Sequence, residues 1–273
     1  MRTTDRYQVF RELHASGCFV IPNPWDLGSA RVLAELGFKA LATTSSGFAW
    51  SLGRPDNHVT LEEALAHLAA VVEAVEVPVN ADFEGGFAVE PDLVARNVAR
   101  AIGTGVAGIS IEDSTQDAAD PLFEFGLATE RVRAARGAID ASGGGVLLTG
   151  RSEGFIAGRP DLAETIRRLV AYAEAGADCL YAPGIRTAAE IAAVVGAVAP
   201  KPVNVLVGSD FTTVEALAAA GVRRISVGGA LARTAWTAFI EAAREIAEHG
   251  TFAGLAPALP SSEVERAMGI SSR

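Results

Sequence analysis

Polar side chains that could bind a metal ion or an anion recur in this chain at the ends of short apolar runs. They are Asn23, Trp25 and Asp26, Thr44–Gly47, Asn80, Asp82 and Glu84, Glu112 and Asp113, Arg151 and Glu153, Tyr181, Asn204, and Gly228–Gly229. Carboxylates brought together by neighbouring runs repel one another unless a cation lies between them. Mg²⁺, or Mn²⁺ in its place, prefers such oxygen ligands, and we expect Asp82 and Glu112 to supply them. Alternatively, either carboxylate could cap the following helix or pair with Arg151.

Arg151 ends a buried run and needs an anion, because a guanidinium keeps its charge in proteins. A substrate carboxylate or a developing oxyanion is the expected partner, with Glu153 or Glu112 as the structural alternative. The turn Thr44–Gly47 adds hydroxyl groups and backbone N–H groups beside a glycine, a combination suited to holding a carboxylate or oxyanion.

Two other kinds of site receive less support from the sequence. A Ser-His-Asp hydrolase is disfavoured because His14, His58, His67 and His249 all lie away from the ends of the apolar runs, and no G-x-S-x-G motif occurs. Gly228 and Gly229 open the last long helix and could bind a phosphate, although close packing of helix and strand explains them better.

The elements that must position these residues alternate between strands and helices. Four segments, LAELGFKALATT, AIGTGVAGISIEDS, YAEAGADCLYAPG and LAAAGVRRISVGG, each place a glycine where a helix should stop, followed by an apolar run. With the intervening runs they predict eight strands near residues 18–23, 40–44, 77–82, 108–113, 146–153, 179–184, 202–207 and 224–229. The strands are apolar almost throughout, as in a parallel sheet buried on both faces. The chain is therefore predicted to be one (β/α)₈ TIM-type barrel, with an open doubly wound sheet as the alternative.

Composition restricts the environment and the partners. The net charge is −10 and basic residues do not cluster, which argues against nucleic acid as a partner. Cys18 and Cys179 suggest neither a disulfide framework nor a zinc site, so we expect a reducing cytoplasm. No apolar run reaches membrane-spanning length. We expect the barrel to occupy residues 1–248, with 249–273 as a terminal tail or a helix exchanged between subunits.

Several of these motifs together resemble one enzyme superfamily. The run NPWDLGSARVLAELGFKALATTSSGFAWSLGRPD, then PVNADFEGGF, GISIEDS, LLTGRSEGF and YAPG, is similar in content and order to the isocitrate lyase and phosphoenolpyruvate mutase superfamily over residues 20–230. The resemblance implies a (β/α)₈ barrel assembled as a homodimer or homotetramer. It also implies Mg²⁺ and a small anionic 2-oxo acid, whose C–C or P–C bond is cleaved or formed through an enolate-like intermediate.

The resemblance also assigns roles to residues. Ser45, Ser46 and Gly47 would hold the substrate carboxylate. Trp25 and Asn204, which follow apolar runs, are expected from their positions as further substrate contacts. Asp56, Asp82 and Glu112 would hold the metal directly or through water, and Arg151, with Glu112, would act in catalysis at the developing enolate.

Two departures from the family pattern narrow the expected activity. Asn80 occupies the position of the family's leading metal aspartate. The segment STQDAADPLFEFGLATERV lacks both the cysteine-containing loop of the isocitrate and methylisocitrate lyases and the lysine and asparagine of the phosphonate mutase. The chain therefore resembles a cysteine-lacking member, similar to oxaloacetate decarboxylase or carboxyphosphonate mutase. The expected activity is a Mg²⁺-dependent lyase or decarboxylase acting on a 2-oxo acid or substituted malate. The alternatives are a P–C mutase or hydrolase acting on phosphonopyruvate or phosphoenolpyruvate, and a non-catalytic barrel that binds a 2-oxo acid.

Overall fold

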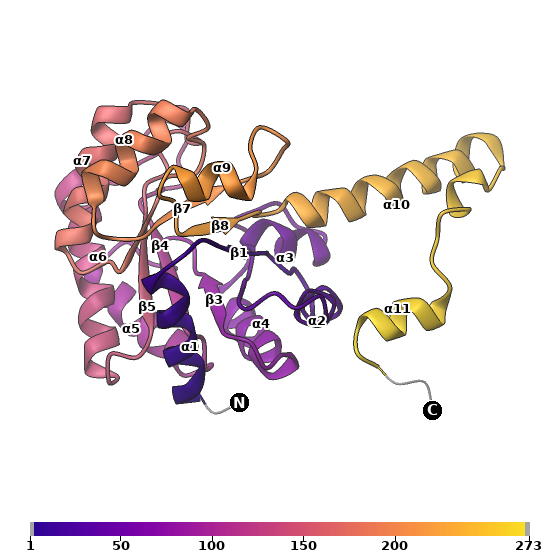
Figure 1. Cartoon of the computed structure of the whole chain (residues 1–273), viewed down its shortest axis with the longest axis horizontal. Helices are drawn as coiled ribbons and strands as arrows, with labels where there is room; N and C mark the ends of the chain where they lie inside the picture. The colour runs from indigo at the N-terminus through magenta and orange to yellow at the C-terminus, as the bar shows by residue number, and fades with distance from the viewer. Residues whose placement is uncertain (1–2, 271–273) are drawn as a thin grey trace.

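Eight parallel strands form one sheet that curls into a nearly closed barrel, as predicted (Figure 1). A computed structural model describes residues 3–270 of the chain. The strands are β1 (Phe19–Ile21), β2 (Leu41–Ala42), β3 (Val79–Asp82), β4 (Gly108–Glu112), β5 (Leu147–Arg151), β6 (Cys179–Tyr181), β7 (Val203–Leu206) and β8 (Arg224–Ser226). Their order in the sheet is β1-β8-β7-β6-β5-β4-β3-β2. Between the two end strands, the N–H of Ala42 donates to the carbonyl of Pro22 at 3.1 Å, so the barrel closes beside β1.

Most helices connect the strands on the outside of the barrel, and the others precede the first strand or follow the last. They are α1 (Thr3–Ala15), α2 (Leu27–Glu35), α3 (Ser45–Ser51), α4 (Leu61–Ala74), α5 (Pro91–Ile102), α6 (Phe125–Ala141), α7 (Leu162–Glu174), α8 (Ala188–Val198), α9 (Val214–Ala219), α10 (Ala230–His249), the 3₁₀ turn η1 (Ala253–Leu255) and α11 (Ser261–Ala267). The four predicted junctions hold: Gly37, Gly105, Gly176 and Gly221 all have positive φ where a helix gives way to a strand.

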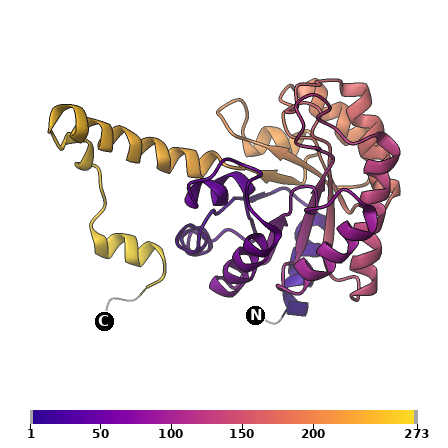
Figure 2. The same ribbon diagram turned by 180° about the vertical axis from the view of Figure 1, so that it is seen from behind.

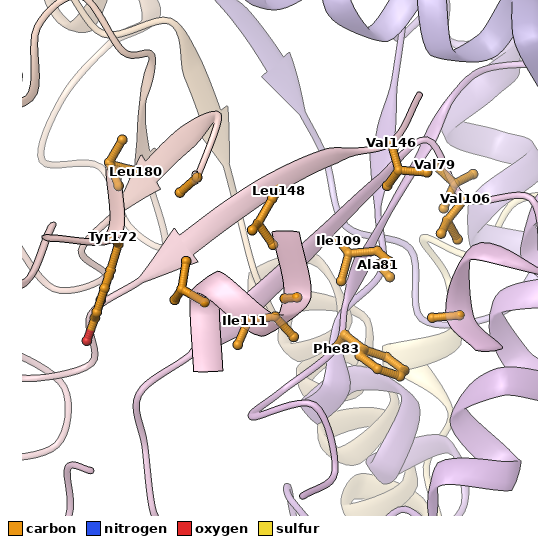
Figure 3. Packing of buried hydrophobic residues seen from close by; sticks show 14 of the residues in the cluster. Val79, Ala81, Phe83, Val106, Ile109, Ile111, Val146, Leu148, Tyr172 and Leu180 are labelled. Carbon is orange, nitrogen blue, oxygen red and sulfur yellow. The ribbon is translucent and has the colours of Figure 1, made fainter. Parts of the chain in front are cut away.

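The core lies between the strands and the helices around them. Along β3, Val79 and Ala81 face outward, where they join residues such as Ile109 and Leu148 in a cluster that excludes water (Figure 3). Asn80 and Asp82 alternate with them and therefore face the barrel interior. At the opposite end from the predicted site, Phe10 of α1 packs with a second, smaller group comprising Ile21, Ala40, Ala42, Ala107 and Leu147. The polar interior thus has an apolar floor.

Helix α10 leaves the barrel instead of covering it (Figures 1 and 2). Ala232 is the buried residue of this 20-residue helix. The chain then turns back through η1, and α11 lies beside α2, where Met268 approaches Gly28. Helix α10 therefore projects away from the strands, and the chain turns back after its end at His249. The last three residues of the predicted tail, 271–273, lie outside the described part of the chain.

Within residues 3–270, none of the helices combines the length and the apolar character that crossing a lipid bilayer requires.

Candidate active site

A cavity of about 200 Å³ opens at the carboxyl ends of the strands, where the sequence placed the site. Its lining comprises Ile21, Asn23, Ala42, Thr43, Thr44, Ser45, Ser46, Asp56, Asn80, Asp82, Ser110, Arg151, Ile156, Tyr181, Asn204, Leu206, Arg224, Ser226, Gly228 and Gly229. A larger hollow of about 520 Å³ lies elsewhere, against residues 120–125 and 159–168, and it does not include the predicted metal ligands. The chemistry therefore belongs to the smaller, interior cavity.

Arg151 is the centre of an ion-pair cluster at the mouth of this cavity. Its Nη1 lies 3.1 Å from Asp82 Oδ1 and 3.2 Å from Glu112 Oε2, and Nε and Nη2 both donate to Glu153. Burial opposes the charge on Arg151, but the three carboxylates outweigh it and hold the pKa of Arg151 well above its usual value. The ion-pair alternative considered from the sequence is thus what the structure contains. The guanidinium is fixed in place by these contacts.

Carboxylates outnumber cations at this mouth. Burial, followed by the charges of Asp82 and Asp56, raises the pKa of Glu84 to about 7. Burial likewise raises the pKa of Glu112 well above its ordinary value, although Arg151 opposes the shift. The pKa of Asp56 is raised because protein displaces water from its carboxyl and because Asp82 is near. A divalent cation would relieve this repulsion.

The donor set at the mouth suits a cation held by few protein ligands. Within residues 3–270, no three acidic, histidine or cysteine side chains are arranged to enclose a metal ion. Mg²⁺ commonly binds one or two carboxylates and completes its coordination with water. The carboxylates of Asp82 and Asp56 are therefore enough protein ligands of the right type. Asn80 lines the cavity, but its Oδ1 lies over Gly108 beside the Phe10 ring and has no hydrogen-bond partner. Asn80 therefore does not replace the missing aspartate in this geometry.

The turn at residues 44–47 contributes hydroxyl groups more than free N–H groups. The N–H of Ser45 donates to Asp82 Oδ2 at 3.1 Å, and the N–H of Gly47 is directed to Thr44 Oγ1 at 3.4 Å. Ser45 and Ser46 line the cavity, and Thr44 Oγ1 lies 3.1 Å from Ser46 Oγ. The turn is thereby tied to the carboxylate cluster through Asp82.

The lower part of the cavity is polar, and one of its residues was not anticipated. Arg224 of β8 is 3% exposed, and its Nε donates to Asn204 Oδ1 at 2.9 Å. Asn204 in turn donates to Ser226 Oγ at 2.9 Å, and Arg224 Nη2 donates to Thr149 Oγ1 at 3.0 Å. Asn204, predicted as a substrate contact, therefore lines the cavity with its amide group already engaged.

Residues 10–247 match the family described as phosphoenolpyruvate phosphomutase. The chain belongs to this family. Its place within the isocitrate lyase and phosphoenolpyruvate mutase superfamily confirms the resemblance seen in the sequence. A solved structure from Burkholderia cenocepacia, provisionally assigned as a lyase/mutase, is 46% identical, covers 99% of this chain and 98% of its own, and has a TM-score of 0.95.

Two relatives with assigned activities are also similar to this chain, at lower sequence identity. The oxaloacetate decarboxylase of Bradyrhizobium diazoefficiens is 31% identical over 195 residues, which are 68% of this chain and 65% of the relative. The structure of oxaloacetate acetylhydrolase in complex with its product oxalate is 28% identical, with a TM-score of 0.87 and coverage of 97% and 94%. Both belong to the group of lyases and mutases to which the phosphoenolpyruvate mutase family contributes.

Three predicted site residues, Trp25, Gly47 and Glu112, are not among the residues that line the cavity, although Glu112 reaches Arg151 at its mouth. Trp25 instead lines an apolar groove of about 510 Å³ with Val32, Leu36 and Leu231. Gly47 is buried with Trp25 Cβ and Thr44 Cγ2 only 2.8 Å from the place where a Cβ would lie. The physical reason is that the chain turns outward after Asn23, so Trp25 packs behind the 44–47 turn. In this geometry Trp25 and Gly47 make packing contacts beside the turn.

The segment after β4, where this chain departs from its family, is anchored by Asp113. Asp113 Oδ2 accepts from Tyr172 at 2.6 Å and lies 3.2 Å from Arg168, while Oδ1 accepts from the N–H of Glu153 at 2.7 Å. Beyond this anchor, Gln116 Nε2 donates to Asn57 Oδ1 at 3.1 Å, on the loop that carries Asp56. Asp113 is therefore a structural residue, and the segment closes over the acidic side of the mouth.

Histidine 14 supplies a pH-dependent contribution to stability. Burial, and then the charge of Arg224, lowers the pKa of His14 to about 3. The unfolded chain binds a proton at this histidine below its ordinary pKa of about 6.5, whereas the folded chain does not do so until about 3. The contribution is therefore complete above pH 6.5 and falls by about 1.4 kcal/mol per pH unit below it.

We expect the free energy of unfolding of wild type to fall by about 2 kcal/mol more than that of His14→Gln between about pH 7 and pH 5. Urea denaturation at both pH values measures this difference. His249→Gln, at an exposed position, is the control and should track wild type. Equal losses in wild type and His14→Gln would show that His14 is not held neutral by the fold.

Proposed function

We propose that this protein is a Mg²⁺-dependent carbon–carbon lyase or decarboxylase acting on a small 2-oxo acid or substituted malate. The observation that carries the proposal is the arrangement at the cavity mouth, where Arg151 and a surplus of carboxylates meet the Ser45–Ser46 turn. The similarity to oxaloacetate decarboxylase supports the reaction class.

The acidic residues and the arginine of the site would have different roles. Asp82 and Asp56 would hold the cation, with Glu84 and Glu112 nearby to orient its water ligands. Bound Mg²⁺ would polarise the 2-oxo group and stabilise negative charge on its oxygen. Ser45 and Ser46 would position the carboxylate next to that group, and Arg151 would stabilise the oxyanion from the other side. With an oxaloacetate-like acid, C4 leaves as CO₂ when the C3–C4 bond breaks, the electron pair of that bond moves toward the C2 oxygen, and a proton from water then adds at C3 to give the 2-oxo acid product.

Oxaloacetate is the first substrate to test. We expect the purified protein to release pyruvate and CO₂ from oxaloacetate in the presence of Mg²⁺, at least about 100-fold faster than after treatment with EDTA. Adding back Mg²⁺ should restore the rate, and Mn²⁺ should substitute for it. A coupled lactate dehydrogenase assay, corrected for the spontaneous and metal-catalysed background, measures the release. Turnover that survives complete removal of divalent ions would contradict the proposal, as would the absence of turnover across substituted malates.

One observation weakens the P–C alternative. Asn23 Oδ1 accepts hydrogen bonds from the N–H groups of Val227 and Gly228 at 2.9 and 2.8 Å. Two of the N–H groups at this turn are thus already used and are not free to bind a phosphate. Phosphorus NMR of phosphonopyruvate incubated with the protein separates the two chemistries. A binding protein without catalysis would show calorimetric binding and no turnover of either substrate.

We propose further that two copies associate through α10 and the segment that follows it. This region exposes apolar side chains that its own barrel does not cover, namely Leu231, Phe239, Ile240, Ile246, Phe252, Leu255, Leu259, Val264 and Ile270. A projecting helix with such a surface gains most of its stability from packing against a partner. The apolar groove beside α2, with Val32, Leu36 and Leu231, offers a complementary surface on a second copy.

Phe239→Glu should convert the assembly to a monomer, because it places a charge in the middle of the proposed contact. Light scattering coupled to size-exclusion chromatography measures the mass. Glu241→Gln, on the same helix, serves as the matched control. A monomeric wild type, or a Phe239→Glu variant with unchanged mass, would contradict this mode of association.

A further inference from the structure

Tyr181 is a buried titratable group inside the cavity that the proposed mechanism does not yet use. It ends β6, is 8% exposed and lines the cavity. Arg151, its register partner on β5, places Cζ 5.3 Å from the centre of the phenol ring. The phenol hydroxyl forms a hydrogen bond with the side chain of Ser226 on β8. Because β7 separates β6 from β8, the side chain extends inward past β7, and its hydroxyl lies in the interior of the barrel.

The side of the cavity on which this hydroxyl lies can be compared with the geometry of a bound 2-oxo acid. In the proposed binding mode the carboxylate lies at the Ser45–Ser46 turn after β2, and the 2-oxo oxygen faces Arg151 on β5. The 2-oxo carbon is trigonal, so its third substituent, C3, points away from both of these groups. In a ring of eight strands, the side away from β2 and β5 is that of β7 and β8, which the Tyr181 hydroxyl reaches beside Ser226. The carbon that must receive a proton therefore faces the phenol.

The other polar groups on this side of the cavity are poor proton donors. The amide of Asn204 is not an acid at neutral pH, and the guanidinium of Arg224 keeps its charge in proteins. A serine hydroxyl is a much weaker acid than a phenol. No histidine, cysteine or lysine is among the described residues that line the cavity. Tyr181 is therefore the strongest acid on the side where C3 lies.

We propose that Tyr181 is the catalytic acid that protonates C3 of the enolate. The phenol O–H bond breaks as the C3–H bond forms, and the electron pair on the C2 oxygen returns to restore the 2-oxo group. The phenolate then takes a proton from water, so the proton in the product still comes from solvent. This inference rests on the proposed function and adds to it the residue through which that proton passes.

The surroundings of Tyr181 suit a group that gives up its proton only when the enolate forms. Burial raises the pKa of Tyr181 to about 12, although Arg151 and Ser226 oppose the shift. The resting phenol is therefore protonated at neutral pH. Once it has donated, the Arg151 guanidinium beside the ring and the Ser226 hydroxyl both stabilise the phenolate until water reprotonates it.

Deuterium exchange at C3 of pyruvate tests the proton donor separately from bond cleavage. An acid that protonates the enolate also removes a proton from pyruvate in the reverse direction. Wild type with Mg²⁺ should therefore exchange the methyl protons of pyruvate in D₂O, which proton NMR measures after correction for the exchange caused by Mg²⁺ alone. Tyr181→Phe keeps the ring beside Arg151 and removes only the hydroxyl. Tyr7→Phe is the matched control, because Tyr7 of α1 lies against Gly145, before the start of β5.

We expect Tyr181→Phe to slow the exchange by at least about 100-fold and the release of CO₂ from oxaloacetate by less than about 10-fold. Calorimetric titration with oxalate, which has no C3, should show affinities within about threefold of wild type. Tyr7→Phe should match wild type in all three measurements. Ser226→Ala should slow the exchange by about 3- to 10-fold, and it decides the question if Tyr181→Phe does not fold.

Exchange at the wild-type rate in Tyr181→Phe, or in Ser226→Ala if that variant decides, would overturn the role of Tyr181. Equal losses of exchange and CO₂ release in Tyr181→Phe would also overturn it, as would CO₂ release by wild type without any exchange. The proposed function would stand in each of these cases. If wild type neither releases CO₂ nor exchanges the protons of pyruvate, the proposed function fails and the role of Tyr181 fails with it.

Discussion

Arg151→Met should abolish nearly all turnover of a 2-oxo acid, with a loss of about 10³-fold. The guanidinium lies among Asp82, Glu112 and Glu153, where it would stabilise the oxyanion formed during bond cleavage. Its removal also leaves these carboxylates without their cation. Breaking a buried ion pair by deleting one partner costs about 3–5 kcal/mol, so the variant should also be less stable.

Steady-state kinetics and urea denaturation of the same variant separate these two effects. Arg151→Lys keeps a charge but loses the fork that reaches three carboxylates, so it should recover stability more than activity. Arg100→Met serves as the control, because Arg100 forms an exposed pair with Glu62 and its loss should change stability by less than about 1 kcal/mol. An Arg151→Met variant with normal turnover would remove Arg151 from the mechanism.

Asp82→Asn should cause the second large loss, by weakening the binding of divalent cations. Asp82 is the carboxylate shared by Arg151 and the N–H of Ser45, and its charge contributes to the raised pKa of Glu84. Asparagine has nearly the same shape and its amide oxygen can still accept from Ser45. We therefore expect the fold to persist while cation affinity falls by at least about 10-fold and turnover by about 10³-fold.

Electron paramagnetic resonance of added Mn²⁺ reports the cation directly, without relying on activity. Asp92→Asn, in the first turn of α5 and away from the cavity, should leave the Mn²⁺ titration unchanged. If Asp82→Asn binds Mn²⁺ as wild type does, Asp82 is not a ligand. If its turnover also persists, the carboxylate cluster serves structure alone.

Much of the fold could be predicted because its signals are local. A helix that ends at a positive-φ glycine and is followed by an apolar strand recurs at Gly37, Gly105, Gly176 and Gly221, and each instance needs only a few residues to be recognised. The carboxyl ends of parallel strands meet at one edge, so the polar residues after them converge. For that reason Asp82, Arg151 and Ser45 were assigned to one site and were found together.

Arg224 and Trp25 show where this reasoning ends. Site residues were expected at the ends of strands, but Arg224 begins β8 and enters the cavity because strand register brings it beside Asn204 and Thr149. Trp25 follows a strand end, yet its Cβ packs beside Gly47 and its side chain lines an apolar groove outside the cavity. Both outcomes depend on contacts between residues far apart in the sequence, which spacing alone does not encode.

Helix α10 illustrates a related limit. The expected barrel, residues 1–248, includes this helix, and apolar residues on a helix normally predict a covered face. The pattern does not say whose surface covers it. Phe239 and Ile240 remain exposed, so the covering surface is not the helix's own barrel.

The side chain of Asn23 affects where the barrel opens first when it unfolds locally. Where β1 meets β2, few backbone hydrogen bonds join the neighbouring strands, and Asn23 bridges the gap by donating to the Thr43 carbonyl and accepting from Val227 and Gly228. The amide of Asn23 thus takes the place of a backbone hydrogen bond between β1 and β2, and it links residues on both sides of this junction of the barrel, hereafter the seam. Because Thr43 is followed immediately by the 44–47 turn, local opening at this seam would loosen the serines before it disturbed the guanidinium on β5. A single asparagine therefore couples opening of this seam to the position of the proposed substrate-binding turn.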